Sequence, residues 1–145
     1  MKAHELMRRD LTAVDLDTPV TRVIYLMDQS GLTSLPVVDE EGRVVGIVSE
    51  RDLIRAALPG YLDMLQSASF LPSVNQLARR LGEIAHEPIA KFMTREVVTV
   101  RPDDGDFHIA DIMIRKGLKQ IPVVDADGHL VGVVRRIDLL HRLKP

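Results

Sequence analysis

The sequence predicts an α/β (α+β) fold made of two tandem copies of a β-α-β-β-α unit, with a helical insert between the copies. The main observation is internal repetition: residues 7–53 align without a gap with residues 93–139, and 17 of the 47 aligned pairs are identical. The second observation is that both copies show the same order of strand-like and helix-like apolar patterns. Repeated units usually bury their apolar faces against each other, so we expect one domain of two equivalent halves.

The first copy begins with a predicted strand and a helix. Residues 11–14 form the strand, and Thr18 followed by Pro19 is typical of a helix N-cap and first helical position. Gly31 is placed to end this helix with a positive φ angle. An apolar stripe at helical spacing consists of Val20, Val23, Ile24 and Met27.

A hairpin and a second helix complete the first copy. The β-branched residues 35–38 and 43–48 predict two strands. Gly42 lies in the turn between them, where a left-handed backbone conformation is needed. The polar residues 49–52 then begin a helix.

The second copy repeats this order. Its predicted strands are 97–100, 121–124 and 130–134. Asp104 is the expected N-cap of the intervening helix, and Gly117 is expected to end it. The apolar stripe of this helix is Ile109, Ile112 and Met113. A last helix is predicted from Arg136 towards the C-terminus.

The chain therefore divides into repeat 1 at residues 1–54, a helical insert at 55–88 and repeat 2 at 89–145. One short helix is predicted in the insert from Tyr61, Leu62 and Leu65. A second helix is predicted from Pro72, with apolar positions Val74, Leu77, Ala78, Leu81 and Ile84. We expect these helices to pack against the duplicated core or against a second subunit.

Composition excludes several classes of function. The chain has 145 residues, 46% of them apolar, a formal net charge of −2 and no cysteine. The charge gives no electrostatic case for nucleic-acid binding, and disulfides, thiolate catalysis and cysteine-based zinc sites are excluded. No apolar run resembles a signal peptide or a membrane span. A soluble cytoplasmic protein without membrane contact is the default expectation.

Other candidate motifs are weak. The five histidines have neither i, i+4 nor His-x-His spacing, so no metal site is expected. Asp103, Asp104 and Asp106 lie at a predicted helix start, where acidic residues are favourable. No phosphate-binding loop or nucleophile elbow is present, and nothing in the sequence supports an enzyme.

The repeated residues carry a family resemblance. The first copy contains Leu35-Pro36-Val37-Val38-Asp39, Val45-Gly46-Ile47-Val48-Ser49 and Asp52-Leu53. The second contains Ile121-Pro122-Val123-Val124-Asp125, Val131-Gly132-Val133-Val134 and Asp138-Leu139. This pair of motifs resembles the CBS domain, the regulatory module named after cystathionine β-synthase. The resemblance implies two antiparallel sheets about a pseudo-twofold axis, and two clefts that hold AMP, ADP, ATP, S-adenosylmethionine or dinucleotides.

The resemblance implies a ligand site in the first copy. The family pattern Gly-h-h-Ser/Thr-x-x-Asp, in which h is apolar, is matched from Gly46 through Ser49 to Asp52. Asp52 would accept both ribose hydroxyls, and Ser49 would donate to the ribose or the α-phosphate. The slot for the base would be lined by Thr12, Ala13, Leu35, Pro36 and Ile47. The residues alone favour a helix capping box formed by Ser49 and Asp52, whereas the family resemblance favours the ligand site, and both roles can coexist.

The second copy departs from the pattern because Arg135 replaces the hydroxyl residue while Asp138 remains. Arg135 can clamp a phosphate or fill the cleft and block it. Pairing of Arg135 with a carboxylate inside the cleft would favour the blocking interpretation. The residues expected to line this cleft are Thr99, Gln120, Ile121 and Pro122.

These observations give two functional hypotheses. The first is a stand-alone regulatory protein that binds an adenosine-containing ligand and signals to a protein effector. The second is a structural module with vestigial clefts that acts through dimerisation. Under both hypotheses, unpartnered apolar helix faces predict a homodimer.

Overall fold

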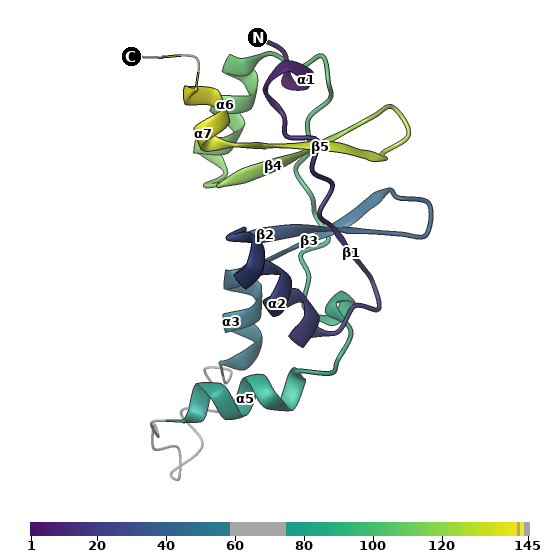
Figure 1. Cartoon of the computed structure of the whole chain (residues 1–145), viewed down its shortest axis with the longest axis vertical. Helices are drawn as coiled ribbons and strands as arrows, with labels where there is room; N and C mark the ends of the chain where they lie inside the picture. The colour runs from purple at the N-terminus through teal and green to yellow at the C-terminus, as the bar shows by residue number, and fades with distance from the viewer. Residues whose placement is uncertain (59–74, 142, 144–145) are drawn as a thin grey trace.

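The structure is a computed structural model that describes residues 1–58, 75–141 and 143, and it confirms the predicted α/β fold. Figure 1 shows two similar halves stacked along the long axis, each with helices on one side and a hairpin tip on the other. The first half comprises β1 (Val14–Asp15), α2 (Val20–Ser30), β2 (Ser34–Val38), β3 (Val44–Ser49) and α3 (Glu50–Ala57). The second comprises α6 (Asp106–Arg115), β4 (Gln120–Val124), β5 (Leu130–Arg135) and α7 (Arg136–Leu140). Outside this repeated set lie α1 (Ala3–Leu6), α5 (Gln76–Ile84) and the 3₁₀ helix η1 (Ile89–Lys91).

The two sheets share a register but differ in strand number. In the first half β1 runs parallel to β2, and β2 is antiparallel to β3. Within the described part of the chain, the second sheet consists of β4 and β5. The strand predicted at 97–100 is wrong except at its end, where Val100 forms a single parallel bridge with Val123. The strand predicted at 11–14 likewise begins only at Val14, which pairs with Val37.

The predicted helix caps are corrected by the hydrogen bonds. Thr18 Oγ1 accepts from the backbone N–H of Asp15 at 3.0 Å, and Asp104 Oδ2 accepts from that of Arg101 at 2.8 Å. Each side chain therefore closes the turn before the helix, and the residue after it occupies the N-cap. Gly31 ends α2 at φ 70° as predicted, because a left-handed residue suits a helix C-terminus.

The first residues of each repeat pack onto the opposite half. Ala3 in α1 belongs to the core of the second half, whereas Ile89 and Met93 belong to the core of the first. The backbone N–H of Ala3 donates to the carbonyl of Asp104 at 2.8 Å. Its counterpart 86 residues later, Ile89, makes the equivalent 2.8 Å bond to Thr18. This reciprocal exchange ties the halves into one unit.

Two glycines of the repeated motif permit this exchange. A Cβ atom on Gly46 would lie 2.5 Å from Met93 Sδ, and one on Gly132 would lie 2.5 Å from Met7 Sδ. The Gly132 position is tighter, since the same Cβ would also lie 2.9 Å from the backbone oxygen of Arg8. Both glycines are thus required by the close approach of a crossing segment.

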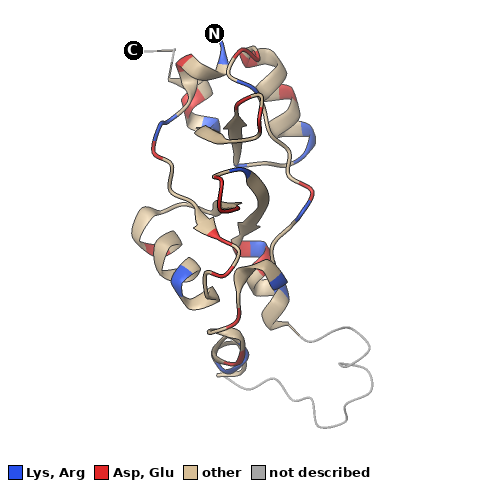
Figure 2. Cartoon of the chain, turned by 90° about the vertical axis from the view of Figure 1, so that its right-hand side faces the viewer, with Lys and Arg blue, Asp and Glu red and all other residues tan. Residues whose placement is uncertain are grey.

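Contacts between equivalent residues mark the pseudo-twofold axis. Arg43 and His129, at the two hairpin tips, form an antiparallel bridge. Gln120 Nε2 donates to the carbonyl of Ser34 at 2.8 Å. The members of each pair are 86 positions apart, as in the sequence repeat, so both pairs lie on the axis that relates the halves. Acidic and basic residues are interspersed over both halves (Figure 2).

The two cores are equivalent, and the insert extends the first of them. Val37 and Val123 are fully buried at matching places, as predicted. Helix α5 packs against α3, where Arg80 Nε donates to the carbonyl of Ala57 at 2.8 Å, and Ile84 packs on the first core. Leu77, at 47% exposure, faces outward instead. The helix predicted around Tyr61, Leu62 and Leu65, and the start at Pro72, lie outside the described residues. Within the described ranges, no helix is long and apolar enough to cross a membrane.

Candidate functional site

Two clefts open between the halves. The Ser49 cleft, with a volume of about 340 Å³, lies at the junction of β3 and α3 and is completed by residues from segments 94–98 and 116–120. The Arg135 cleft, with a volume of about 410 Å³, lies at the junction of β5 and α7 and is completed by residues from segments 8–12 and 30–36. Both volumes fall in the range of small-molecule sites.

The clefts are related by the same axis as the halves. Segments 8–12 and 94–98 are equivalent in the repeat, and so are segments 30–34 and 116–120. Three residues near the axis, Thr33, Lys119 and Gln120, line both clefts. The crossing segments therefore build each cleft from both halves, and the two clefts share a wall.

In the Ser49 cleft, Asp52 is held by hydroxyl and amide donors. The backbone N–H and hydroxyl of Ser49 donate to Asp52 Oδ2 at 2.9 and 3.1 Å. Thr94 Oγ1 donates to Asp52 Oδ1 at 3.0 Å, and Arg55 Nη1 lies 3.7 Å from the same oxygen. The Ser49 hydroxyl also accepts from the N–H of Asp52 at 3.3 Å, so the predicted capping box is present.

Asp52 nevertheless reaches the cleft. It is only 8% exposed, but it lies on the cleft wall together with Ser49 and Thr94. A carboxylate has about four acceptor positions, and the three hydrogen bonds above leave Oδ1 with capacity for another donor. Helix α3 begins here, and its N-terminus favours an anion. The arrangement can accept a ligand hydroxyl while it caps the helix.

In the Arg135 cleft, the equivalent carboxylate is covered by the arginine. Arg135 Nε and Nη2 donate to the two oxygens of Asp138 at 3.3 and 3.1 Å, and the Arg135 backbone N–H donates at 2.8 Å. Arg8 Nε and His141 Nδ1 each lie 3.9 Å from Asp138 Oδ1. Asp138 is 6% exposed and is not among the described residues that line the cleft.

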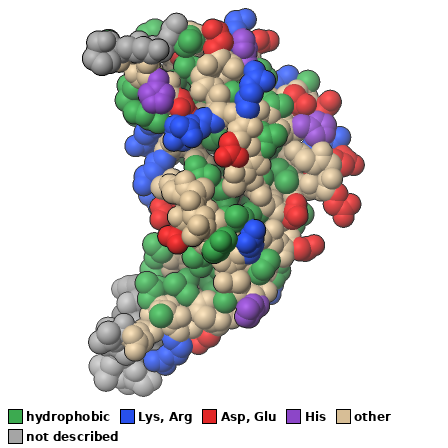
Figure 3. Space-filling model, viewed as in Figure 1, with side chains coloured by type: hydrophobic (Ala, Val, Ile, Leu, Met, Phe, Trp, Pro, Cys, Tyr) green, Lys and Arg blue, Asp and Glu red, His purple; other side chains and the backbone are tan. Residues whose placement is uncertain are grey.

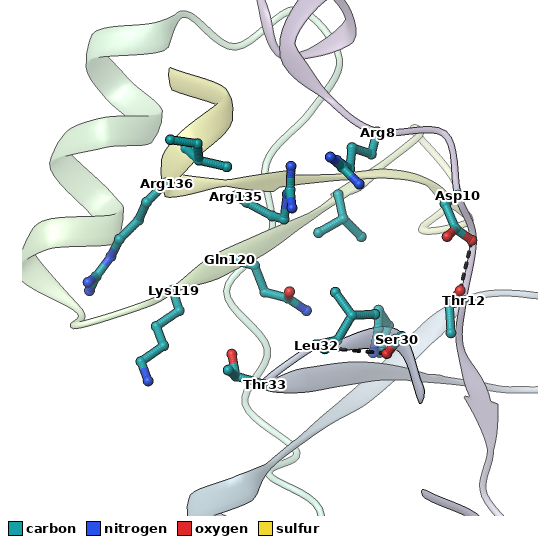
Figure 4. Close-up of a pocket in the computed structure, with 14 residues that line it drawn as sticks. Arg8, Asp10, Thr12, Ser30, Leu32, Thr33, Lys119, Gln120, Arg135 and Arg136 are labelled. Carbon is teal, nitrogen blue, oxygen red and sulfur yellow. Dashed lines mark hydrogen bonds between the residues drawn. The ribbon is translucent and has the colours of Figure 1, made fainter. Parts of the chain in front are cut away.

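This pairing is the one associated above with a blocked cleft, but the cleft is not filled. A cavity of about 410 Å³ remains beside Arg135, whose side chain is 26% exposed. Arg135 therefore removes the carboxylate from the wall and leaves the space open. Figure 4 shows the side chains of Arg8, Arg135, Gln120 and Lys119 around this space.

The clefts also differ in charge. The cations of the Ser49 cleft are Arg51, Arg55, Lys116 and Lys119, and its carboxylates are Glu50, Asp52 and Glu96. The described residues that line the Arg135 cleft include four cations, Arg8, Lys119, Arg135 and Arg136, but a single carboxylate, Asp10. That carboxylate accepts a hydrogen bond from Thr12 at 2.7 Å, on the side of the cleft away from Lys119 and Arg136 (Figure 4). Basic side chains are visible around the notch between the halves in Figure 3.

The predicted site residues are divided between these places. Ile47, Ser49 and Asp52 meet in the Ser49 cleft, while Thr12, Pro36 and Arg135 line the other, and Gln120 lines both. Leu35 and Ile121 are fully buried in the two cores. The remaining expected residues, Ala13, Thr99, Pro122 and Asp138, are not among the described lining residues of either cleft.

Sequence reasoning missed three side chains that shape the clefts: Arg8, Thr94 and Lys119. Arg8 and Thr94 follow Met7 and Met93 and are equivalent in the repeat. The 86-residue spacing could therefore have indicated that both residues occupy matching places in the two clefts. They contact the carboxylates of the opposite half because the crossing segments pair there with Val133 and Ile47.

One group of described residues has metal-ligand chemistry. Asp125, Asp127 and His129 place one potential ligand atom each within 4.8 Å of one another, away from the clefts at the second hairpin turn. Asp125 Oδ1 accepts from the backbone N–H groups of Asp127 and His129 at 2.9 Å. These bonds close the turn and explain the clustering without an ion.

Comparison with known proteins gives a consistent result. Residues 3–59 and 89–145 each match the CBS domain. A CBS domain-containing protein of Dictyostelium discoideum is 30% identical over 139 residues, which cover 96% of this chain and 88% of that protein. CBSX2 is a CBS-pair protein from Arabidopsis thaliana. Its structure in complex with AMP aligns with this chain at TM-score 0.73 and 26% identity, and the alignment covers 97% of this chain and 94% of CBSX2. The cytosolic domain of the Mg²⁺ channel MgtE in complex with ATP aligns at TM-score 0.70 and 26% identity, covering 98% of this chain and 48% of that one.

Proposed function

Because the chain belongs to the CBS domain family, we propose that it is a non-catalytic regulatory CBS pair. In this proposal the chain binds an adenosine-containing ligand and passes the resulting conformational signal to a partner protein. AMP, ADP, ATP and S-adenosylmethionine are the candidate ligands. The similar CBSX2 and MgtE domains, in complex with AMP and ATP respectively, support the adenine nucleotides among them.

The observation that carries the proposal is the carboxylate on the wall of the Ser49 cleft. Asp52 lies there with acceptor capacity on Oδ1, beside the hydroxyls of Ser49 and Thr94. A ribose diol donates two hydrogen bonds, and a carboxylate is the side chain best suited to accept them. In this proposal Asp52 receives the diol, and the hydroxyls adjust to the ribose or the first phosphate.

Isothermal titration calorimetry with adenosine, AMP, ATP and S-adenosylmethionine tests the proposal. We expect saturable binding of at least one adenosine compound, with guanosine as the matched control for base selectivity. The absence of heat with every adenosine compound, in a folded protein, would favour the alternative of a structural module with vestigial clefts.

We further propose that the protein is a homodimer whose four repeats form a disc. Hydrophobic side chains gather over α7 and α3 on the helix-bearing edge in Figure 3. The exposed apolar residues of the four repeated helices are Ile24, Tyr25, Ile54, Phe107, Ile114, Ile137 and Leu140. Burying such faces against a second copy stabilises association. Light scattering should give twice the 16.2 kDa chain mass at micromolar concentration, and a monomer mass would refute the dimer.

A further inference from the structure

Among the described residues that line the Arg135 cleft, four are cationic, and they come from three parts of the chain. Arg8 comes from the crossing segment, Arg135 and Arg136 from the junction of β5 and α7, and Lys119 from the end of the loop before β4. Arg8 and Arg135 are neighbours because both approach Asp138, and Figure 4 shows them together on one wall. The described lining residues comprise four cations and the carboxylate of Asp10, and Asp138 beside Arg135 adds a second negative charge; the positive charge that remains around this cavity favours an anionic ligand.

Arg135 is oriented for a second anion by its pairing with Asp138. A guanidinium has five N–H donors, and Asp138 takes one from Nε and one from Nη2. Three N–H donors are then left on the outer edge of a side chain that is 26% exposed and lines the cavity. Because a paired guanidinium is held in one plane, its free edge suits bidentate contact with phosphate oxygens.

Asp138 is correspondingly unsuited to a ribose diol. Its Oδ2 accepts hydrogen bonds from the backbone N–H and the Nε of Arg135, and its Oδ1 accepts one from Nη2 of Arg135. Arg8 Nε and His141 Nδ1 also lie 3.9 Å from Oδ1. The two aspartates are buried to nearly the same degree, but Asp52 lines its own cleft, whereas Asp138 is not among the described residues that line the Arg135 cleft. Because Arg135 lines the cavity and Asp138 does not, a diol that approaches Asp138 from the cleft has to displace a paired guanidinium, which costs more than displacing a neutral hydroxyl.

From this we infer that the Arg135 cleft is a polyphosphate site, which recognises the phosphate chain of a di- or triphosphate ligand and does not read a ribose diol. Arg135 and Arg8 bind the phosphate oxygens of the ligand, and Asp138 positions Arg135. The inference rests on the proposed nucleotide-binding function but departs from the ribose-reading pattern of the family motif. It assigns the two clefts different ligand chemistry.

Two probes separate this inference from the proposed function. Inorganic tripolyphosphate and adenosine are titrated separately by calorimetry in magnesium-free buffer, with the wild-type chain and with Arg135→Ser, Arg8→Gln and Arg9→Gln. Arg9 adjoins Arg8 and is exposed, but it is not among the lining residues, so Arg9→Gln is a charge-matched control. Thermal unfolding confirms that each variant is folded.

We expect one tripolyphosphate site per chain. Arg135→Ser should weaken it at least tenfold, roughly the effect of losing hydrogen bonds to a charged group. Arg8→Gln should weaken it about threefold or more, Arg9→Gln should leave it unchanged, and added salt should weaken it in the wild type. The adenosine affinity of the Ser49 cleft should remain in all three variants.

The inference is overturned if tripolyphosphate does not bind, if it binds Arg135→Ser as tightly as the wild type, or if Arg9→Gln has the same effect as Arg8→Gln. Retained adenosine binding in those cases would leave the proposed function standing. Conversely, Arg135-dependent tripolyphosphate binding without binding of any adenosine compound would support the anion site and contradict the proposed function.

Discussion

The two clefts have the same architecture but hold their carboxylates differently. At equivalent positions one contains Ser49 and the other Arg135, while Asp52 and Asp138 occupy the same place in the following helix turn. Ser49 is short, so it caps the helix and leaves Asp52 on the cleft wall. Arg135 is long and charged, so it covers Asp138 and adds its own donors to the wall. One substitution within a duplicated unit thus changes which chemical group each cleft presents.

The largest effects are expected from substituting the two glycines that contact Met7 and Met93. Gly132→Ala should lower the free energy of unfolding by about 3 kcal/mol, because its Cβ meets the Arg8 backbone as well as Met7. Gly46→Ala should cost about 1 kcal/mol, since its Cβ meets only the Met93 side chain, which can adjust. Urea denaturation measures both values.

A control for these variants lies in the insert. Among the described residues outside its own helix backbone, none has an atom within 4 Å of the position that a Cβ on Gly82 of α5 would occupy, so Gly82→Ala should stabilise the helix by about 0.5–1 kcal/mol. Equal destabilisation by Gly46→Ala and Gly132→Ala would contradict the claim that the two crossings are packed differently.

The second prediction compares the two carboxylates. Asp52→Ala should weaken binding of an adenosine ligand by about 1.5–3 kcal/mol, or roughly tenfold to 150-fold. Asp138→Ala should weaken nucleoside binding less, because Arg135 already occupies that carboxylate. Calorimetry with AMP measures both. Equal and negligible losses would mean that the two residues serve only as helix caps.

The third prediction converts one cleft towards the other. Arg135→Ser recreates the Gly-h-h-Ser-x-x-Asp pattern and exposes Asp138 to the cavity. We expect a second adenosine-binding event, with an affinity within about tenfold of the first, where the wild type shows one. An unchanged number of adenosine sites would show that Arg135 is not what keeps a diol from Asp138.

The smallest expected effect concerns the two hairpin turns. Asp39 Oδ1 accepts from the backbone N–H groups of Arg43 and Glu41, and Asp125 accepts equivalent bonds from His129 and Asp127. These hydrogen bonds hold the pKa of each carboxyl below its ordinary value. The largest contribution comes from the backbone N–H of Arg43 for Asp39 and from that of His129 for Asp125.

The folded protein therefore binds fewer protons than the unfolded chain in mild acid. The stabilisation from each carboxylate is present above the unfolded pKa and is lost as pH falls through the lowered folded pKa. Asp39→Asn and Asp125→Asn keep an acceptor oxygen but not the charge. Each should slightly lower the urea midpoint at neutral pH and match the wild type in strong acid. A deficit that persists at low pH would mean that the charge is not responsible.

Much of the fold was predictable because the repeat aligns without a gap. Local sequence patterns that occur once in each copy predict the hairpins and the left-handed glycines. The alignment of the copies predicts the equivalent burial of Val37 and Val123. The exchange of α1 and the segment at Ile89 between the halves was not predictable, because it depends on long-range packing that no local pattern reports. That exchange also explains the site. Thr94 and Arg8 reach the carboxylates of the opposite half, and Thr12 and Pro36 line the cleft of Arg135 and not that of Asp52.

The most direct test of unequal clefts is a crystal structure of the wild-type protein with ATP. We expect a ribose diol on Asp52 in the Ser49 cleft. We also expect a phosphate chain on Arg135 and Arg8 in the other cleft, with the ion pair between Arg135 and Asp138 intact. Two nucleotides bound in the same pose, each with its ribose on the aspartate and with Arg135 turned away from Asp138, would contradict this expectation.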